Sequence, residues 1–331
     1  MIIVAAHSGS YPRIGDSLDQ QKLRRAIESC QRGELSELEL KNAQDNVARE
    51  ALAEQIKAGL DAVSDGQVRR HDAVSHIMGQ LPGVSVQGLL RYFDTNTYFR
   101  QPHVTSAISE SGPLLADEVA FARAAAKRPV LVSLLGPLTL SRLSLIKGAP
   151  YKNADALLEA LTPILAEEAA RLAQAGADAI VIEEPFLLKE PAALSKLGEA
   201  LKAIAARKGN LRLWLSITFG DAAKLYSKLQ DLPIDGLQLD LTYGGAVQDA
   251  IQSLGSQLAL SLGIVDARNT RLETPTDVAR QAESLLKKAR GPIAMLAASN
   301  GLEYLPRGRA FEKLAVLAQA RDLLVDQKGN Q

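Results

Sequence analysis

Polar side chains, most of them ending in oxygen, come directly after a series of apolar runs in this sequence. In "PIAMLAASNG", residues 292–301, the apolar run ends at Ser299 and Asn300. An apolar run flanked by Pro and Gly is typical of a buried strand, and parallel barrels keep their reactive groups just after the strands. The residues that follow the apolar runs are therefore the first candidates for chemistry.

Carboxylates, hydroxyls and amides dominate these positions, and none of them is a cysteine. Several carboxylates at one barrel mouth repel one another unless a cation, an arginine or a shared proton intervenes. The candidate catalytic residues are Asp65, Glu183, Asp240 and Arg268. The candidate substrate-binding residues are Ser8, Ser10, Gln67, Glu184 and Asn300 after the runs, and Arg91, Asn96 and Tyr98 from a longer loop.

The elements that must position these residues follow a regular alternation. Eight apolar runs, which end near residues 8, 66, 136, 185, 220, 244, 266 and 301, are separated by stretches with helical signals. This pattern predicts an α/β fold, a single (β/α)8 TIM barrel made of a parallel sheet with crossover helices. We expect one domain over residues 1–331, with a long insertion between strands 2 and 3 at about residues 67–112.

Capping residues mark several helix boundaries. Ser36 and Glu39 form a capping box, and Gly59 is placed to end the helix that they open. Thr274, which is followed by a proline, predicts the start of another helix. Pro163 lies within a third helical pattern and should kink that helix or mark its start.

The predicted insertion contains the most aromatic segment of the chain. "RYFDTNTYFRQP", residues 91–102, holds four aromatic residues and two arginines, although only 4% of the chain is aromatic. Two interpretations stay open. The segment is either a structural cover over the barrel mouth or a binding loop in which Arg91 and Arg100 contact a carboxylate or a phosphate.

Composition excludes several functional classes. Lys plus Arg equals Asp plus Glu, 38 each, so no global field attracts nucleic acid or an anionic membrane. Cys30 is the single cysteine, which excludes an internal disulfide and a zinc site with two thiolates from one chain. The N-terminal segment lacks the pattern of a signal peptide or a membrane span. We therefore expect a cytoplasmic protein that acts on a small molecule.

Seven segments, in this order, resemble the cobalamin-independent methionine synthase family. They are "GSYPRIG" at 9–15, "SDGQVRRHD" at 64–72, "RYFDTNTYFRQP" at 91–102, "LLGPLTLSRLS" at 134–144, "EEP" at 183–185, "LSLGIVDARNTRLETP" at 260–275 and "ASNGLEYLPRGRAFEKL" at 298–314. The chain is similar to one of the two barrels of the full-length members. The resemblance implies methyl transfer to homocysteine from a methylated folate or, in short relatives, from a methylated corrinoid such as methylcobalamin.

The resemblance also implies that the zinc site of the family is altered here. The family's zinc ligands are a His and a Cys two residues apart, a Glu, and a final Cys. The matching positions of this chain hold Ser216, Thr218, Asp240 and Asn300. Because only Asp240 is a good zinc ligand, we expect no bound zinc. A thiol substrate with a pKa near 8.5 would then be mostly protonated at neutral pH.

Further roles follow from the resemblance. Ser8 and Ser10 match the segment that receives the carboxylate of an amino acid. Glu183 and Asp65 are expected to hold an ammonium group, and Gln67 replaces a family glutamate near the substrate amine.

The remaining roles concern the rim of the mouth. Arg268 stands where the family has a catalytic histidine, and it could balance the acidic mouth or hold an anionic substrate. Arg91, Asn96 and Tyr98 are expected to form a wall like a lid.

Three functional hypotheses result. The first is a methionine-synthase-like protein of methyl-group metabolism that binds an amino-acid or folate-like ligand at the C-terminal mouth; as an enzyme it would be a methyltransferase with altered chemistry. The second is a non-catalytic partner subunit of a separately encoded zinc-bearing barrel, and a corrinoid protein is another candidate partner. In the third, Asp65, Glu183, Glu184 and Asp240 hold Mg, Mn or Fe through oxygen.

Overall fold

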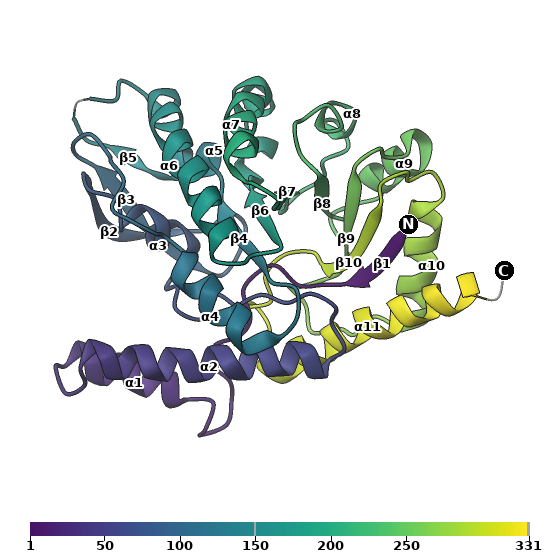
Figure 1. Ribbon diagram of the computed structural model, residues 1–331, viewed down its shortest axis with the longest axis horizontal. Helices are drawn as coiled ribbons and strands as arrows, with labels where there is room; N and C mark the ends of the chain where they lie inside the picture. The colour runs from purple at the N-terminus through teal and green to yellow at the C-terminus, as the bar shows by residue number, and fades with distance from the viewer. Residues whose placement is uncertain (149, 330–331) are drawn as a thin grey trace.

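Seven parallel strands form the main sheet of the computed structural model, which describes residues 1–148 and 150–329 (Figure 1). The order across the sheet is β1, β10, β9, β8, β7, β6 and β4. The strands are β1 (Ile2–Ala5), β4 (Leu131–Leu135), β6 (Ala179–Glu183), β7 (Arg212–Ile217), β8 (Gly236–Asp240), β9 (Ala259–Val265) and β10 (Ile293–Ala298).

Two isolated parallel bridges close this sheet into a barrel. Ala6 pairs with Ala62, and Val63 pairs with Val130, so residues 62–63 stand between the end of β1 and the start of β4. The predicted (β/α)8 barrel is confirmed, although its second strand is shorter than the apolar run suggested. The reason is local, because the Gln55 side chain bonds both the N–H and the carbonyl of Ser64. A longer strand would need those backbone groups for its own pairing.

Helices surround the barrel, and the predicted capping residues act as expected. The Ser36–Glu39 capping box opens α2, which ends just before Gly59, and the Thr274 side chain accepts a hydrogen bond from the N–H of Asp277. The helix α6 continues through Pro163, so the proline does not mark its start. The helices are α1 (Lys22–Gln31), α2 (Glu37–Lys57), α3 (Ala73–Met78), α4 (Ala116–Ala126), α5 (Pro137–Leu143), α6 (Ala154–Gln174), α7 (Leu194–Arg207), α8 (Tyr226–Leu229), α9 (Ala246–Leu254), α10 (Pro275–Leu286) and α11 (Arg307–Gly329).

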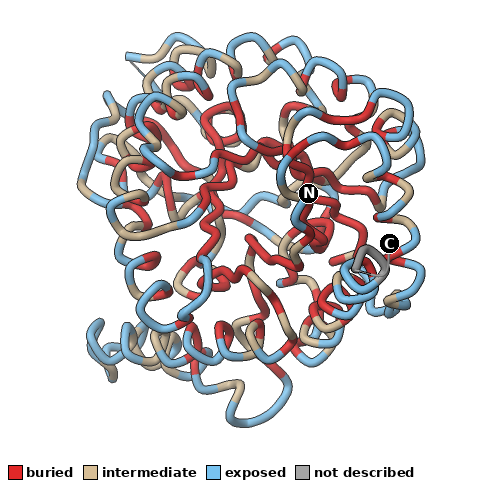
Figure 2. Tube along the Cα trace, turned by 45° about the vertical axis from the view of Figure 1, so that its right-hand side comes forward, coloured by how far each residue is buried: buried red, intermediate tan, exposed pale blue. Residues whose placement is uncertain are grey.

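A small second sheet is built mainly from the segment between the second and third barrel strands. Its strands β2 (Val84–Arg91) and β3 (Tyr98–Val104) form an antiparallel hairpin, and the short β5 (Leu145–Ile146) adds to β3 in parallel. The hairpin connection, residues 92–97, carries the aromatic segment that was singled out in the sequence. Figure 2 shows buried residues around the centre of the molecule and exposed residues on its periphery.

The interior of the barrel changes from apolar to polar along the strands. Trp214 in β7 is 2% exposed and lines a cavity at the N-terminal end of the barrel, together with Met295 and Leu131. Ser216, the next residue on the same face of β7, lines a pocket at the C-terminal end. The indole therefore lies between the cavity at the N-terminal end and the polar pocket at the C-terminal end.

A carboxylate fixes the turn that follows β4. Glu184 is fully buried and accepts hydrogen bonds from the N–H groups of Leu138 and Thr139 and from the Thr139 hydroxyl. These donors belong to the first turn of α5, where backbone N–H groups have no partner within the helix. Glu184 thus ties the end of β6 to the start of α5.

Across the described residues, every helix is too short or too polar to span a membrane.

Gly236 leaves room for the Trp214 ring, and this contact can be tested. A Cβ at position 236 would lie 2.3 Å from the nearest ring atom of Trp214. We expect Gly236→Ala to lower the free energy of unfolding by about 1–3 kcal/mol, the usual cost of overpacking, as measured by denaturant unfolding. Gly245→Ala is the matched control, since its Cβ would meet nothing within 4 Å. Equal stabilities of the two variants would contradict this account.

The buried carboxylate predicts a pH dependence of stability. Burial raises the pKa of Glu184 from its ordinary 4.5 to about 7, although its hydrogen-bond donors act to lower it. Between these values the folded state binds more protons than the unfolded state, so stability falls as pH rises. Glu184→Gln should show a shallower fall in Tm between about pH 5 and pH 7.5 than the unsubstituted chain. The exposed Glu199→Gln serves as the control, and an unchanged slope in Glu184→Gln would count against the assignment.

Candidate functional site

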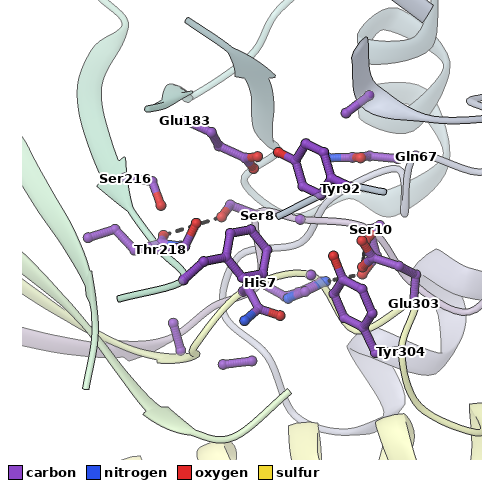
Figure 3. Close-up of a pocket in the computed structure, with 18 residues that line it drawn as sticks. His7, Ser8, Ser10, Gln67, Tyr92, Glu183, Ser216, Thr218, Glu303 and Tyr304 are labelled. Carbon is purple, nitrogen blue, oxygen red and sulfur yellow. Dashed lines mark hydrogen bonds between the residues drawn. The ribbon is translucent and has the colours of Figure 1, made fainter. Parts of the chain in front are cut away.

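A pocket lies at the C-terminal ends of the barrel strands (Figure 3). We call it the inner pocket. Its lining combines hydroxyls, amides, two glutamates and aromatic rings, and among the described residues no Lys or Arg belongs to it. The main lining side chains are His7, Ser8, Ser10, Gln67, Tyr92, Glu183, Ser216, Thr218, Phe219, Gln238, Asn300, Glu303 and Tyr304.

The floor of the inner pocket is a hydrogen-bonded layer across the barrel. The Ser8 hydroxyl donates to Oε1 of Gln238 at 3.3 Å, and the Ser261 hydroxyl reaches the same oxygen at 3.4 Å. Ser216, Gln238 and Ser261 are register partners on the adjacent strands β7, β8 and β9. Because inward side chains of neighbouring strands share one level, this layer presents polar atoms to the space above it.

One wall of the pocket is acidic. Glu183, at the end of β6, faces the pocket beside the Gln67 side chain, whose amide donates to the Ser133 hydroxyl at 2.8 Å. Desolvation raises the pKa of Glu183, the nearby Glu303 raises it further, and Ser133 and Arg70 oppose the shift. A carboxylate in this environment gains by pairing with a cation.

A second carboxylate stands on the opposite wall. Figure 3 shows Glu303 beside Ser10 and Tyr304, across the pocket from Glu183 and Ser216. The Ser10 hydroxyl donates to the Glu303 carboxylate. The Glu303 side chain borders the inner pocket and two neighbouring cavities, so it has accessible surface although protein surrounds it elsewhere. Desolvation raises the pKa of Glu303.

His7 contributes no positive charge to the pocket. Its side chain is 3% exposed, and Nε2 lies 2.9 Å from the carbonyl oxygen of Ser10. Burial lowers the pKa of His7 to about 4, so the imidazole is neutral at pH 7. A neutral ring with a proton on Nε2 donates to that carbonyl and leaves Nδ1 as an acceptor.

Aromatic rings from the hairpin close the top of the pocket. Phe93 and Phe219 stack at 5.5 Å between ring centroids, and Tyr92 and Tyr304 meet Phe219 edge to face. Gln67, Phe93 and Phe219 all have φ between 48° and 63°, a left-handed conformation that costs energy for residues other than glycine. Such backbone strain gathers at functional sites. Gln67 and Phe219 line the inner pocket, and Phe93 stacks on Phe219.

An outer cavity of about 580 Å³ lies on the far side of Glu303 and Tyr304. Arg91, Asn96 and Arg268 line it. The Arg268 guanidinium stacks on the Tyr243 ring at 3.9 Å. The outer cavity therefore contains guanidinium groups, which the inner pocket lacks, together with the carboxylates of Asp94 and Glu303, and Arg91 forms an ion pair with Asp94.

The structure brings most of the predicted site residues to these spaces. Ser8, Ser10, Gln67, Glu183 and Asn300 line the inner pocket. Arg91, Asn96 and Arg268 line the outer cavity, and Tyr98 lines a side cavity next to Tyr92 and Tyr304.

Three predicted residues line none of these spaces. Glu184 is held at the start of α5 by the hydrogen bonds described above. Asp240 accepts hydrogen bonds from Thr242 and from the N–H of Phe219, so it supports the loops after β7 and β8. Asp65 accepts from the N–H of Gln67. These three carboxylates accept hydrogen bonds from nearby backbone N–H groups, because such groups at strand ends need acceptors.

The matching positions of the zinc site do not fit zinc. Ser216, Thr218 and Asn300 offer neutral oxygen or amide groups, and Asp240 is engaged with its own loops. Within residues 1–148 and 150–329, no group of three or more His, Cys, Asp or Glu side chains is arranged to hold a metal ion. Zinc prefers thiolate, imidazole and carboxylate ligands, so these side chains are a poor match for a zinc ion.

Sequence reasoning missed several residues of the inner pocket, among them Gln238 and Glu303. Gln238 interrupts an apolar strand, and such a polar residue inside a strand was a usable signal. Glu303 follows Asn300 by three residues within a segment that the sequence already singled out. Its contact with Ser10 joins residues 293 positions apart, which periodicity does not reveal.

Comparisons with known proteins agree on one family. A family model described as the N-terminal domain of cobalamin-independent synthase matches residues 79–290. The chain is 28% identical to a methionine synthase of Sulfurisphaera tokodaii, over 98% of this chain and 93% of that protein, and 27% identical to one of Saccharolobus solfataricus, over 96% and 94%.

Solved structures show the same fold. A B12-independent methionine synthase from Shewanella, solved with selenomethionine, aligns with a TM-score of 0.84 at 21% identity and covers both chains fully. A methyltransferase from Methanosarcina mazei aligns at 0.65 and 17% identity, over 97% of this chain and 94% of that one. With the family model covering well over half of its length, the chain belongs to the cobalamin-independent methionine synthase family.

Proposed function

We propose that this chain binds an amino acid in the inner pocket, as a methionine-synthase-like protein of methyl-group metabolism whose chemistry no longer uses the family's zinc. The observation that carries this proposal is the charge of the pocket. Glu183 and Glu303 face it from opposite walls, and no Lys or Arg among the described residues lines it. Such a pocket attracts an ammonium group.

In this proposal, the carboxylate of the amino acid also has a binding site. Ser8 and Ser10 flank Gly9 at the edge of the pocket, and hydroxyl and backbone N–H groups are suitable donors for a carboxylate. The Ser10 hydroxyl donates to Glu303, so the backbone N–H groups of residues 8–10 are the donors proposed for that carboxylate. The related Shewanella protein was solved with an amino acid, selenomethionine.

A methyl donor, if the chain uses one, fits the outer cavity best. A methylated folate carries carboxylates and methylcobalamin carries a phosphate, and Arg91 and Arg268 offer positive charge beside that space. The Glu303 and Tyr304 side chains border both spaces. Acceptor and donor would therefore meet at these two residues.

Amino-acid binding and its dependence on charge can be measured directly. We expect purified chain to bind at least one of L-methionine, L-homocysteine and L-homoserine by isothermal titration calorimetry. Glu183→Gln should weaken that binding by about tenfold to a hundredfold, because a hydrogen bond to a charged partner is lost. Glu159→Gln, which changes an exposed glutamate on α6, is the matched control.

Two results would refute the proposal. Absence of heat with all three amino acids would remove amino-acid binding. Elemental analysis of the same preparation that finds one zinc per chain would show that the zinc positions have been misidentified.

One observation favours a second candidate function. The matching family model describes an N-terminal domain, and the resemblance assigns zinc to the other barrel of the two-barrel enzymes. In this alternative the chain is a non-catalytic partner subunit that docks on a separately encoded zinc-bearing barrel.

Co-expression tests this alternative. If it holds, the chain will co-purify with a single-barrel relative from the same genome that keeps the His-x-Cys pair and the final Cys. Elution of the two proteins as separate species at micromolar concentration would exclude a stable subunit pair.

A further inference from the structure

Two buried polar atoms of the inner pocket lack a hydrogen-bond partner among the described residues. They are Oγ of Ser216 and Oδ1 of Asn300. Ser216 is 1% exposed and Asn300 is 6% exposed, and both line the inner pocket. Buried polar groups are nearly always paired, since an unpaired one costs free energy. A ligand that pairs with both atoms would remove this cost.

Ser216 belongs to the polar floor of the pocket, and Asn300 lines the pocket just after β10. Ser216 is the register partner of Glu183 on one side and of Gln238 on the other. Asn300 donates from Nδ2 to the Ser299 hydroxyl at 3.3 Å, which leaves its oxygen facing no protein donor. Ser216 can donate or accept, whereas the free oxygen of Asn300 accepts.

The same surroundings disfavour a thiolate. Glu183 and Glu303 carry the same sign of charge as a thiolate, and like charges disfavour ionisation. His7 is neutral at pH 7 because burial lowers its pKa to about 4. A thiol would therefore stay protonated, and S–H is a weak donor to Asn300 and a weak acceptor from Ser216.

We propose that the inner pocket selects an amino acid whose side chain ends in a hydroxyl group instead of a thiol. A hydroxyl both donates and accepts, so it can donate to Asn300 and accept from Ser216. This inference rests on the proposed function, in which the pocket binds an amino acid with its ammonium group near Glu183. It adds the chemistry of the side chain, which amino-acid binding alone leaves open.

L-homoserine and reduced L-homocysteine are the probes, since they differ only in one oxygen or sulfur atom. Titration calorimetry of the full chain should give at least about tenfold tighter binding of L-homoserine, because two buried polar groups are satisfied. The preference should shrink in Ser216→Ala and in Asn300→Ala. Ser256→Ala is the matched control, a buried serine whose hydroxyl bonds Gln230 and the carbonyl of Leu258 away from the inner pocket.

Each outcome has one meaning. Tighter L-homoserine binding that depends on both Ser216 and Asn300 supports the inference. Equal or tighter binding of L-homocysteine, or a preference that survives both substitutions, overturns the inference while amino-acid binding stands. Absence of binding by either probe and by L-methionine overturns the inference together with the proposed function.

Discussion

The packing of the Trp214 indole against Gly236 is the contact on which the site depends. The ring occupies the place of a side chain at position 236. Below the ring lies the cavity at the N-terminal end of the barrel, which Leu131, Met295 and the charged Arg212 line. Above the ring, Ser216 and Gln238 present hydroxyl and amide groups to the inner pocket. One large residue therefore separates the cavity at the N-terminal end from the inner pocket at the C-terminal end.

The space above that layer has two parts, which differ in their charged side chains. Negative and neutral groups gather in the inner pocket, while Arg91 and Arg268 lie in the outer cavity, with Glu303 between the two. Other buried carboxylates stabilise the backbone by accepting hydrogen bonds. Glu184 holds the start of α5, and Asp240 holds the strained Phe219. The acidic residues at the strand ends therefore have two roles. Some face a ligand space, and others accept hydrogen bonds from backbone N–H groups.

The order of elements was predictable because each depends on local signals. Apolar runs predicted the barrel strands, and the Ser36–Glu39 pair and Thr274 predicted helix starts that the structure confirms. The second strand was overestimated, since the competing Gln55 side chain comes from a different element. Which strand-end carboxylates face a ligand space was not predictable from residue type, because Glu183 lines the inner pocket while the adjacent Glu184 accepts hydrogen bonds from the start of α5, a contact between segments far apart in the chain.

The sequence by itself determined the class of fold and the family resemblance, because these depend on residue types and their order. Only the tertiary structure decided that Glu303 meets Ser10, that the hairpin rings cover the mouth, and that Ser216 and Asn300 share one pocket. Those facts depend on contacts between residues far apart in the chain. Such contacts arise when the barrel closes and brings the ends of all its strands to one face.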